Sequence, residues 1–486
     1  VHGWYTFSYG NIWIGNYRGG IDFISHTQPM FNILPYTIET AKGLSYKQVW
    51  GMWATDNQVW LGSEDELGLF INGKKIKTYD LYSHELVYNT HINTIYEDRQ
   101  KRLWLGTYKN GILLYKPDKQ EIVHISSSLF NNLDVRCFYE DQNGKMWIGT
   151  ETGIYSCTNE VLVKEEEIQK QLPDIMVHSL LRDKEGKLWV GTFGKGISIF
   201  DVNNKLLWNF VIENGFCSNA VNHMIKDSEE QIWVATREGL AVFKNTSQPN
   251  RYKIFKEKEG LENSHIRAIC EDLEKRIWIS SNDGISCLDP KQNLFYNYNH
   301  HDGVPMGDFM NGSTCMTHNG IIYFGSQNGA CFFNPKELSS IRQVSPVKIT
   351  QFCKYNKKTE SKDAEISIPF KKGVVHLPYN QNSFRITFNV LDYTQSPQVE
   401  FTYMLEGLEN RWYDTQGENQ VIFRNIPPGK YNFKVRTRIR NQEWDKEIAS
   451  LNIFIAPPLW LTWYAKLGYV ILFIFALYAL LRFYKR

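Results

Sequence analysis

The sequence predicts an all-β protein: a seven-bladed β-propeller, then an Ig-like β-sandwich, then one transmembrane helix. Three observations lead to this prediction. An aromatic-rich motif recurs with a nearly constant period over most of the chain. After the motif ends, the sequence continues as alternating strands separated by turns. A long apolar run with a single charge follows near the C-terminus.

The repeat determines the first domain. Each copy has an apolar strand start, an Asp, a short polar turn, an apolar-Trp-apolar-Gly-Thr strand and a later Gly, as in VRCFYEDQNGKMWIGTETGIYSC. The aromatic anchors of successive copies lie 42 to 47 residues apart. A period of this length with short strands is typical of a four-stranded propeller blade. The anchors are Trp13, Trp60, Trp104, Trp147, Trp189, Trp233, Trp278 and Tyr323.

The anchors from Trp60 to Tyr323 predict one closed seven-bladed ring over residues 46–340. Residues 1–45, which contain Trp13, are then interpreted as the remnant of a preceding propeller. An eight-bladed ring that includes Trp13 is the alternative. In five copies an Asp stands six residues before the anchor, where it suits the first turn. The anchor itself is expected in the core between blades.

The C-terminal part of the sequence predicts a sandwich and a membrane anchor. Residues 344–456 alternate as strands do, which favours an Ig-like fold. Residues 459–481 carry one charge, Lys466, and are long enough to cross a bilayer. Basic residues follow, so residues 1–458 are expected outside and the stub 482–486 in the cytoplasm. A buried core helix is the alternative. Pro457 and Pro458 predict a short, stiff joint before the helix.

Composition and motifs exclude several functions. The 54 basic residues nearly balance the 52 acidic ones, so nothing indicates a nucleic-acid binder. The eight Cys form no CxxC and are expected to be buried free thiols. No catalytic motif occurs, and the twelve His lack metal-ligand spacing. We therefore predict no catalytic residue, no metal and no cofactor, although the many carboxylates leave a glycosidase pair open.

One position, just inside the first strand of each blade, varies in residue type. The innermost strand of each blade begins at one face, so these side chains are expected to surround the channel mouth. Polar groups beside an aromatic ring suit a sugar ligand. A solvated rim of ordinary diversity is the alternative interpretation. The seven residues are Trp50, Asn93, Arg136, His178, Asn222, Arg267 and Ser313.

The motifs also resemble a known family. The WIGT and WLGT blades resemble two-component regulator propeller repeats, and the segment from FTYMLEGLENRW to VIFRNIPPGKYNFKVRTR resembles the triple-tyrosine domain that follows them. Phe423 stands where that domain usually has a tyrosine. The residues that fall on its motif are Tyr403, Gly407, Trp412, Pro428, Gly429 and Tyr431.

This resemblance implies the periplasmic sensor region of a hybrid two-component histidine kinase in the inner membrane. It implies a small oligosaccharide ligand, control of polysaccharide-utilisation genes and a homodimeric parent protein. Catalysis would belong to a kinase domain outside this segment, and this segment would not contact nucleic acid. Such sensors usually carry two propellers, whereas this chain has about one. A membrane-tethered propeller enzyme acting on glycans, or a lectin, is the alternative function.

Overall fold

The structure is a computed structural model, and it confirms the predicted fold class. It consists of two units, residues 1–340 and residues 341–486. The described residues are 3–6, 12–16, 20–24, 30–34, 37–40, 43–46, 48–64, 66–81, 91–125, 133–338, 346–354, 364–366, 375–390, 399–415, 417–439 and 444–484.

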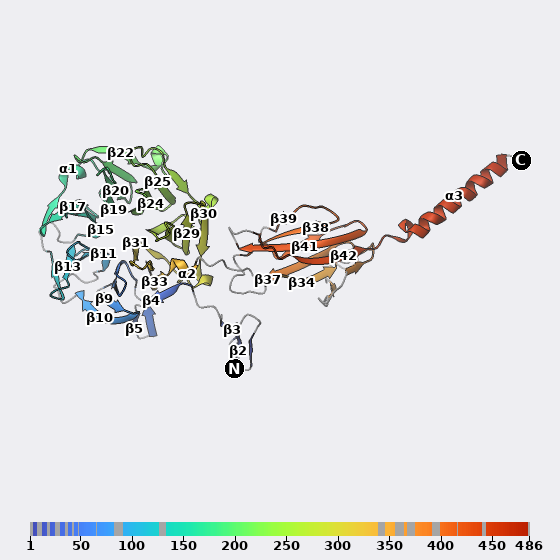
Figure 1. Cartoon of the computed structure of the whole chain (residues 1–486), viewed down its shortest axis with the longest axis horizontal. Coiled ribbons are helices and arrows are strands. Elements are labelled where there is room, and N and C mark those ends of the chain that lie inside the picture. Colours follow the sequence, from blue (N-terminus) through green and yellow to red (C-terminus); the bar gives the residue numbers. More distant parts are fainter. Residues whose placement is uncertain are drawn as a thin grey trace. The chain divides into compact units, whose positions relative to one another are not determined.

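Seven four-stranded antiparallel sheets surround a common axis in the first unit (Figure 1). The innermost strand of each sheet neighbours those of the two adjacent sheets, and the last returns to the first. The ring is therefore closed with seven blades, and the eight-bladed alternative is wrong. The segment around Trp13 instead forms a separate three-stranded sheet of β1 (Gly3–Thr6), β2 (Ile12–Asn16) and β3 (Gly20–Ile24).

The blades run from the innermost to the outermost strand. Blade 1 consists of β7 (Gly51–Ala54), β8 (Gln58–Gly62), β9 (Glu66–Ile71) and β10 (Lys74–Asp80). Blade 2 consists of β11 (Ile92–Glu97), β12 (Leu103–Thr107), β13 (Ile112–Lys116) and β14 (Glu121–His124). Blade 3 consists of β15 (Val135–Glu140), β16 (Met146–Thr150), β17 (Gly153–Thr158) and β18 (Val161–Lys164). Blades 4 and 5 are β19 (Val177–Arg182), β20 (Leu188–Thr192), β21 (Ile197–Phe200), β22 (Leu206–Phe210); and β23 (Val221–Lys226), β24 (Ile232–Thr236), β25 (Gly239–Phe243), β26 (Lys253–Phe255). Blades 6 and 7 are β27 (Ile266–Glu271), β28 (Ile277–Ser281), β29 (Ile285–Asp289), β30 (Leu294–Tyr298); and β31 (Phe309–Met316), β32 (Ile322–Ser326), β33 (Gly329–Phe333), β4 (Asn32–Leu34). Two short helices, α1 (Glu166–Gln169) and α2 (Pro335–Leu338), and the hairpin β5 (Thr37–Thr40) and β6 (Gly43–Tyr46) complete the unit.

Blade 7 is closed by a strand from the beginning of the chain. β4 pairs with β33, with Leu34 opposite Ala330 and Asn32 opposite Phe332. The range 46–340 expected for the propeller therefore starts too late, because this strand precedes blade 1 in the sequence. This pairing gives blade 7 its fourth strand and joins an early segment of the chain to the last blade of the ring.

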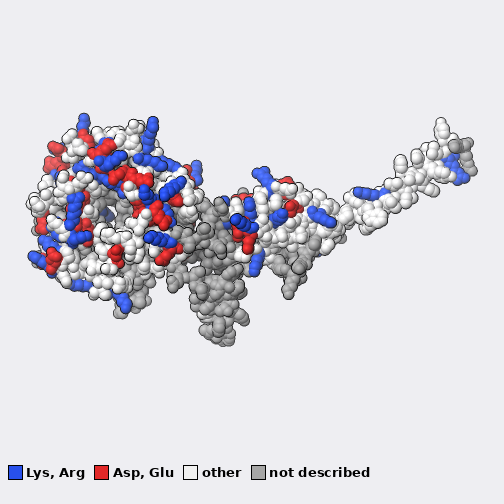
Figure 2. Space-filling model, viewed as in Figure 1, with Lys and Arg blue, Asp and Glu red and all other residues white. Residues whose placement is uncertain are grey.

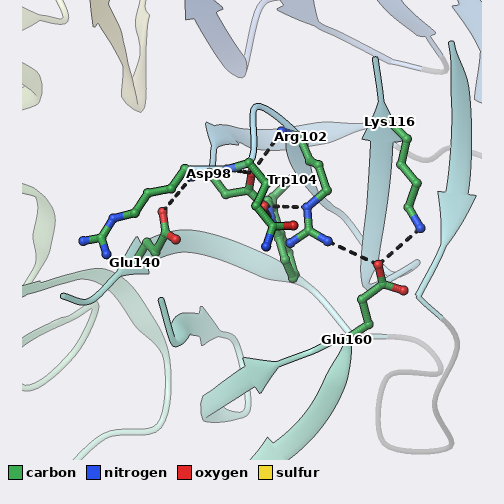
Figure 3. Close-up of polar contacts among 8 residues, drawn as sticks. Asp98, Arg102, Trp104, Lys116, Glu140 and Glu160 are labelled. Atoms are coloured by element: carbon green, nitrogen blue, oxygen red, sulfur yellow. Dashed lines mark hydrogen bonds and ion pairs between the residues drawn. The ribbon is translucent and has the colours of Figure 1, made fainter. Parts of the chain in front are cut away.

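Each of the five repeated Asp residues does more than form a turn. In blade 2, Asp98 accepts a hydrogen bond from Trp104 Nε1 at 2.8 Å, and Arg102 Nε donates to the same oxygen at 2.7 Å (Figure 3). Its other oxygen accepts backbone N–H groups within the turn. Arg102 and Lys116 both pair with Glu160 of blade 3 (Figure 3). This turn thus fixes the anchor indole and joins neighbouring blades. The same Asp–indole bond recurs at Asp141, Asp183, Asp227 and Asp272.

The anchors fill the core between blades, as predicted. Trp233 of blade 5 packs with Ile269 and Phe295 of blade 6. The Gly two residues after an anchor permits this close packing. A Cβ at Gly106 would lie 2.7 Å from the side chain of Val135, the first residue of the next innermost strand. Cβ atoms essentially never approach so closely, which explains why the repeat places glycine there.

The second unit contains a β-sandwich. One sheet has the order β35 (Ala364–Ile366), β34 (Val347–Lys354), β37 (Phe384–Val390), β40 (Gln420–Phe423). The other has the order β36 (Val375–Leu377), β42 (Ala449–Ile455), β41 (Gly429–Ile439), β38 (Val399–Glu406), β39 (Tyr413–Asp414). Alternate residues of β37 are buried, and Phe388 packs against Phe401 and Phe433 of the facing sheet. This alternation is the pattern that the sequence predicted for a sandwich.

A helix long and apolar enough to cross a membrane follows the sandwich. α3 (Trp463–Tyr484) is the one such helix in the described part of the chain. Figure 2 shows it largely bare of charge, in contrast to the mixed acidic and basic surface of the propeller. The predicted range of 459–481 begins too early, because Leu459–Leu461 form a 3₁₀ turn and Thr462 is extended. The carbonyl of Thr462 accepts the first helical bond, from Lys466, so Thr462 has the position of an N-cap.

Candidate ligand site at the channel mouth

The predicted residues of blades 2 to 6 each occupy a β-bulge at the start of the innermost strand. The pairing register shifts at this position in all five blades, for example between Val135 and Cys137. A bulge leaves its extra residue outside the ladder and re-aims its side chain. The variable position is thus the one that the backbone frees from sheet pairing. The five bulge residues are Asn93, Arg136, His178, Asn222 and Arg267.

The two other predicted residues occupy the same end of blades 1 and 7. Trp50 directly precedes β7, and its backbone N–H donates to the carbonyl of Gly62 at 3.1 Å. Ser313 lies in a longer irregularity of β31, between Phe309 and Thr314. Its hydroxyl donates to the carbonyl of Val49 in blade 1 at 3.3 Å.

This contact with the next blade recurs around the ring. Asn93 Nδ2 donates to the carbonyl of Val135 at 3.0 Å, and Asn222 Nδ2 donates to that of Ile266 at 2.6 Å. Each acceptor is the first residue of the next innermost strand. Hydrogen bonds therefore join the strand starts of successive blades and gather these side chains at one mouth of the ring.

Asp134, directly before β15, ties two of the predicted residues together. One of its oxygens accepts Asn93 Nδ2 at 2.6 Å, and the other pairs with the guanidinium of Arg136. Burial raises the pKa of Asp134, although the Arg136 charge opposes this rise. The network holds Asn93 and Arg136 in place across blades 2 and 3.

Aromatic rings line the mouth at blades 1 and 2. The Trp50 ring stacks on His91 with centroids 4.9 Å apart, and His91 stacks on Tyr108 at 4.8 Å. The ammonium of Lys109 lies 4.8 Å from the Tyr108 centroid. Stacked rings of this kind provide an apolar platform bordered by polar edges.

Cationic and imidazole groups line the mouth at blades 4 to 6. Phe193 lies beside His178 with centroids 5.1 Å apart, and the Arg237 guanidinium lies 4.5 Å from the same ring. Burial, together with the charges of Arg136 and Arg237, lowers the pKa of His178 to about 4. His178 is therefore neutral at physiological pH. Arg267 donates to Asn282 at 2.7 Å, to Asn311 at 3.0 Å and to Asp308 at 3.2 Å.

Five buried polar atoms at this mouth have no hydrogen-bond partner among the residues that the structure describes. Buried side-chain polar atoms are nearly always paired, so such a cluster requires an explanation. The cluster contains both donors and acceptors, and it lies at the mouth, where the bulge residues start the innermost strands. The atoms are Trp50 Nε1, Asn93 Oδ1, Arg136 Nε, Asn222 Oδ1 and His265 Nε2.

The sequence prediction missed a second set of residues at the same mouth. These residues lie in the turn between the second and third strands of each blade, four positions after the aromatic anchor. The backbone N–H of Tyr108 donates to His91, and that of Phe193 donates to Met176, which brings this turn onto the strand start. The fixed spacing from the anchor was a signal that could have identified them. They include Tyr108, Glu151, Phe193, Arg237, Asn282 and Gln327.

The chemistry available at the mouth is that of binding. Within the described ranges, no group of three or more His, Cys, Asp or Glu is arranged to hold a metal ion. The eight cysteines are unpaired thiols, and six of them are buried in the blades and the sandwich. Rings, amides and guanidinium groups at the mouth can stack on a ligand and form hydrogen bonds with it.

Two families match parts of the chain. Residues 87–109, 128–152 and 171–194 match the two component regulator propeller, and residues 392–456 match the Y_Y_Y domain. The chain thus carries both kinds of module that the motifs resembled, in the same order.

Three known proteins are similar to the chain over most of its length. The extracellular domain assigned to hybrid two component system BT3049 from B. thetaiotaomicron is 40% identical, with a TM-score of 0.82 over 93% of this chain and 61% of that one. The corresponding domain of BT4673 from the same organism is 20% identical, with a TM-score of 0.53 over 94% and 63%, and shows the fold alone. Histidine kinase P4 of Formosa agariphila is 26% identical over 83% of this chain. The chain spans 34% of the length of that kinase.

Proposed function

We propose that this chain, built from two-component regulator propeller repeats and a Y_Y_Y domain, is the ligand-sensing region of a membrane-bound hybrid histidine kinase. It detects small oligosaccharides outside the cytoplasm, and the parent protein controls transcription of polysaccharide-utilisation genes. The likeness to an extracellular domain of a hybrid two component system supports the sensor role. The likeness to a histidine kinase supports the kinase output.

The observation that carries the proposal is the combination of groups at the channel mouth. Sugar recognition needs an apolar platform for a ring face and hydrogen-bonding groups for the hydroxyls around it. Trp50 and Tyr108 belong to the aromatic stack. The amides of Asn93 on blade 2 and Asn222 on blade 5 each keep a buried oxygen without a partner among the described residues. The alternative, a solvated rim, would require an ordered water on each of these buried atoms.

A short joint between sandwich and helix suits the transmission of a signal. The backbone N–H of Ala456 donates to Leu377 at 2.8 Å, which continues the parallel pairing of β36 with β42. Beyond the two prolines, the Trp460 ring meets Tyr379 edge to face with centroids 5.3 Å apart. The sandwich thus contacts the turn that precedes α3. A ligand changes the kinase state through this joint when it favours one arrangement over the other.

The ends of α3 support an inner-membrane location with a cytoplasmic C-terminus. Trp463 and Tyr464 lie at its first turn, as interfacial aromatics do, and Arg482 lies in its last turn. The parent acts as a homodimer in this proposal, as two-component histidine kinases do, and the kinase receives the signal across the membrane.

A binding experiment tests the sugar site. The chain, held in lipid nanodiscs, is screened by calorimetry against oligosaccharides released from plant and algal polysaccharides. We expect Tyr108→Ala to weaken binding roughly tenfold, since it removes the end of the aromatic stack. Tyr413→Ala, on the sandwich, is the matched control and leaves affinity unchanged. Absence of binding to every oligosaccharide would overturn the proposal.

A second experiment tests the sensor role in the parent protein. The double variant Arg136→Gln, Arg267→Gln removes two guanidinium groups from the mouth. In membranes, we expect this variant to lose ligand-dependent phosphorylation while its ATP-dependent basal phosphorylation persists. Unchanged ligand response in the double variant contradicts a role for the mouth. A parent gene without a kinase domain beyond Arg486 contradicts the sensor role itself.

A further inference from the structure

Basic side chains occur on several blades at the mouth, including Lys109 beside the aromatic stack and Arg136 on blade 3. The aromatic stack occupies blades 1 and 2, whereas Arg237 and Arg267 lie on the adjacent blades 5 and 6. Two histidines lie near these arginines, His178 on blade 4 and His265 on blade 6. Burial lowers the pKa of both histidines most. Next come the charge of Arg136 for His178 and that of Arg267 for His265, and the charge of Arg237 lowers both further. The charge of Arg237 on blade 5 therefore acts on histidines of both neighbouring blades.

Three carboxylates at the mouth already have partners, and a fourth, Glu151, lies on blade 3. Asp134 pairs with Arg136, and Asp308 pairs with Arg267 at 3.2 Å. Asp174 accepts the backbone N–H of Gly194 at 2.8 Å. In the described part of the chain no carboxylate forms an ion pair with Arg237, whose guanidinium instead covers the Phe193 ring. A ring face holds a guanidinium in place without neutralising its charge.

Two further nitrogen atoms at the mouth lack hydrogen-bond partners in the part of the molecule that the structure describes. His265 Nε2 and Arg136 Nε are buried and have no partner within the described residues. The side chain of Arg267 is largely buried, with 17% of its surface exposed. The backbone N–H of Gly239, two residues after Arg237, donates to the carbonyl of Ser264 at 3.0 Å, so the turn that carries Arg237 lies against the strand start of blade 6. There His265 lies within 3.4 Å of Asn282, which accepts Arg267 Nε at 2.7 Å. Burial and the positive charge of Arg237 lower the pKa of Arg267, although Asp308 opposes this. An anion between the two guanidinium groups would relieve their repulsion.

We infer that the oligosaccharide carries an anionic substituent, a uronate carboxylate or a sulfate ester, which Arg237 binds with Arg267 and His265 while the sugar ring stacks on the aromatic side. This inference rests on the proposed function, because it specifies the ligand of the same site. A planar guanidinium with free N–H groups matches the oxygens of a carboxylate or sulfate. The stacked rings on the opposite side of the mouth accept the uncharged ring face.

The anion site is tested first with inorganic sulfate, which needs no knowledge of the sugar. Imidazole signals of the chain in nanodiscs are followed by NMR at low ionic strength, with His178 and His265 assigned by substitution. We expect sulfate to raise the pKa of His178 and His265, because a bound anion offsets the guanidinium charge. In Arg237→Gln, sulfate should leave both unchanged. Arg251→Gln, an exposed arginine elsewhere on blade 5, is the matched control and should behave as the unaltered chain. Equal sulfate effects in both variants would overturn the inference, and so would an absence of any effect.

Paired oligosaccharides then identify the source of the anion. Oligogalacturonate is compared with its carboxyl-reduced form, and a sulfated galactan fragment with its desulfated form. We expect Arg237→Gln to weaken binding of the recognised charged member roughly ten- to hundredfold. The same affinity should fall as NaCl is raised, since screening weakens exposed charge pairs.

The outcomes separate the two proposals. If neutral and charged members bind equally, and Tyr108→Ala weakens both, the sugar site stands and the anionic ligand is wrong. If sulfate acts through Arg237 but no oligosaccharide of either kind binds, the anion site stands and the sugar ligand is wrong. Binding that requires the charged member and Arg237 together supports both.

Discussion

The two ends of the innermost strands follow opposite rules. Where each strand ends, blades 2 to 6 repeat one arrangement: an Asp that accepts an indole N–H and the backbone of its own turn. Where each strand begins, the same five blades share a bulge but carry Asn, Arg, His, Asn and Arg. At the end with the repeated Asp, the buried indole N–H groups are hydrogen-bonded. At the end with varied residues, some buried polar atoms have no partner among the described residues. Stabilising hydrogen bonds thus recur at one face, and the proposed recognition site lies at the other.

Removing an anchor Trp, at the end with the repeated Asp, should lower the free energy of unfolding most. Trp189 is fully buried and belongs to the core of blades 4 and 5. We expect Trp189→Ala to lower the free energy of unfolding by about 3–5 kcal/mol, because it leaves a large cavity. Denaturant titration of the chain measures this. A loss no greater than that of a surface variant such as Arg251→Gln would contradict the assignment of stability to this end.

Removing the Asp alone should cost less. Asp183 accepts Trp189 Nε1 at 3.0 Å and two turn N–H groups. Asp183→Ala leaves the buried indole N–H unpaired, so we expect a loss of about 2–3 kcal/mol in unfolding free energy. Asp201 forms the same kind of turn without a tryptophan partner, through the N–H groups of Asn203 and Lys205. Asp201→Ala is therefore the control, with about 1 kcal/mol or less. Equal losses would show that the indole bond adds nothing.

Acid should lower the free energy of unfolding through two buried histidines near the start of the innermost strands. His178 and the neighbouring His223 have pKa values lowered to about 4, chiefly by burial. Between pH 6.5 and 4 the unfolded chain binds more protons than the folded one, so stability falls as pH falls. We expect a loss of about 2 kcal/mol for each histidine by pH 4.5, measured by denaturant titration at several pH values. The double variant His178→Gln, His223→Gln should flatten this dependence. An unchanged slope in the variant would show that other groups cause it.

The smallest change is expected at a bulge itself. Asn222 donates to Ile266, yet its buried oxygen has no partner in the described residues. Asn222→Ala removes a hydrogen bond and an unpaired polar atom together, so the two effects offset each other. We expect unfolding free energy to change by about 1 kcal/mol or less, in the same titration. A loss as large as that of Asp183→Ala would remove the contrast between the two ends.

Much of the fold was predictable because its signals are local. The anchor spacing, the Asp and the glycines each reflect contacts within one blade or with the next blade. The bulge position was predictable for the same reason, since it has a fixed place in the repeat. The turn residues Tyr108, Phe193 and Arg237 were missed because their residue type varies between blades, although their fixed spacing from the anchor marks their position. Their location at the mouth follows from backbone bonds such as that of Tyr108 to His91.

The sequence by itself determined the repeat, the order of the domains and the candidate membrane helix, because each depends on a period or a run of apolar residues. It left a seven-bladed and an eight-bladed ring both possible, and the structure decided between them. Tertiary structure alone decided how the ring closes, since β4 pairs with β33 about three hundred positions away and a three-residue edge strand has no pattern of its own. It also decided which polar atoms at the mouth stay unpaired. Pairing depends on distances between blades, and a one-dimensional pattern does not contain those distances.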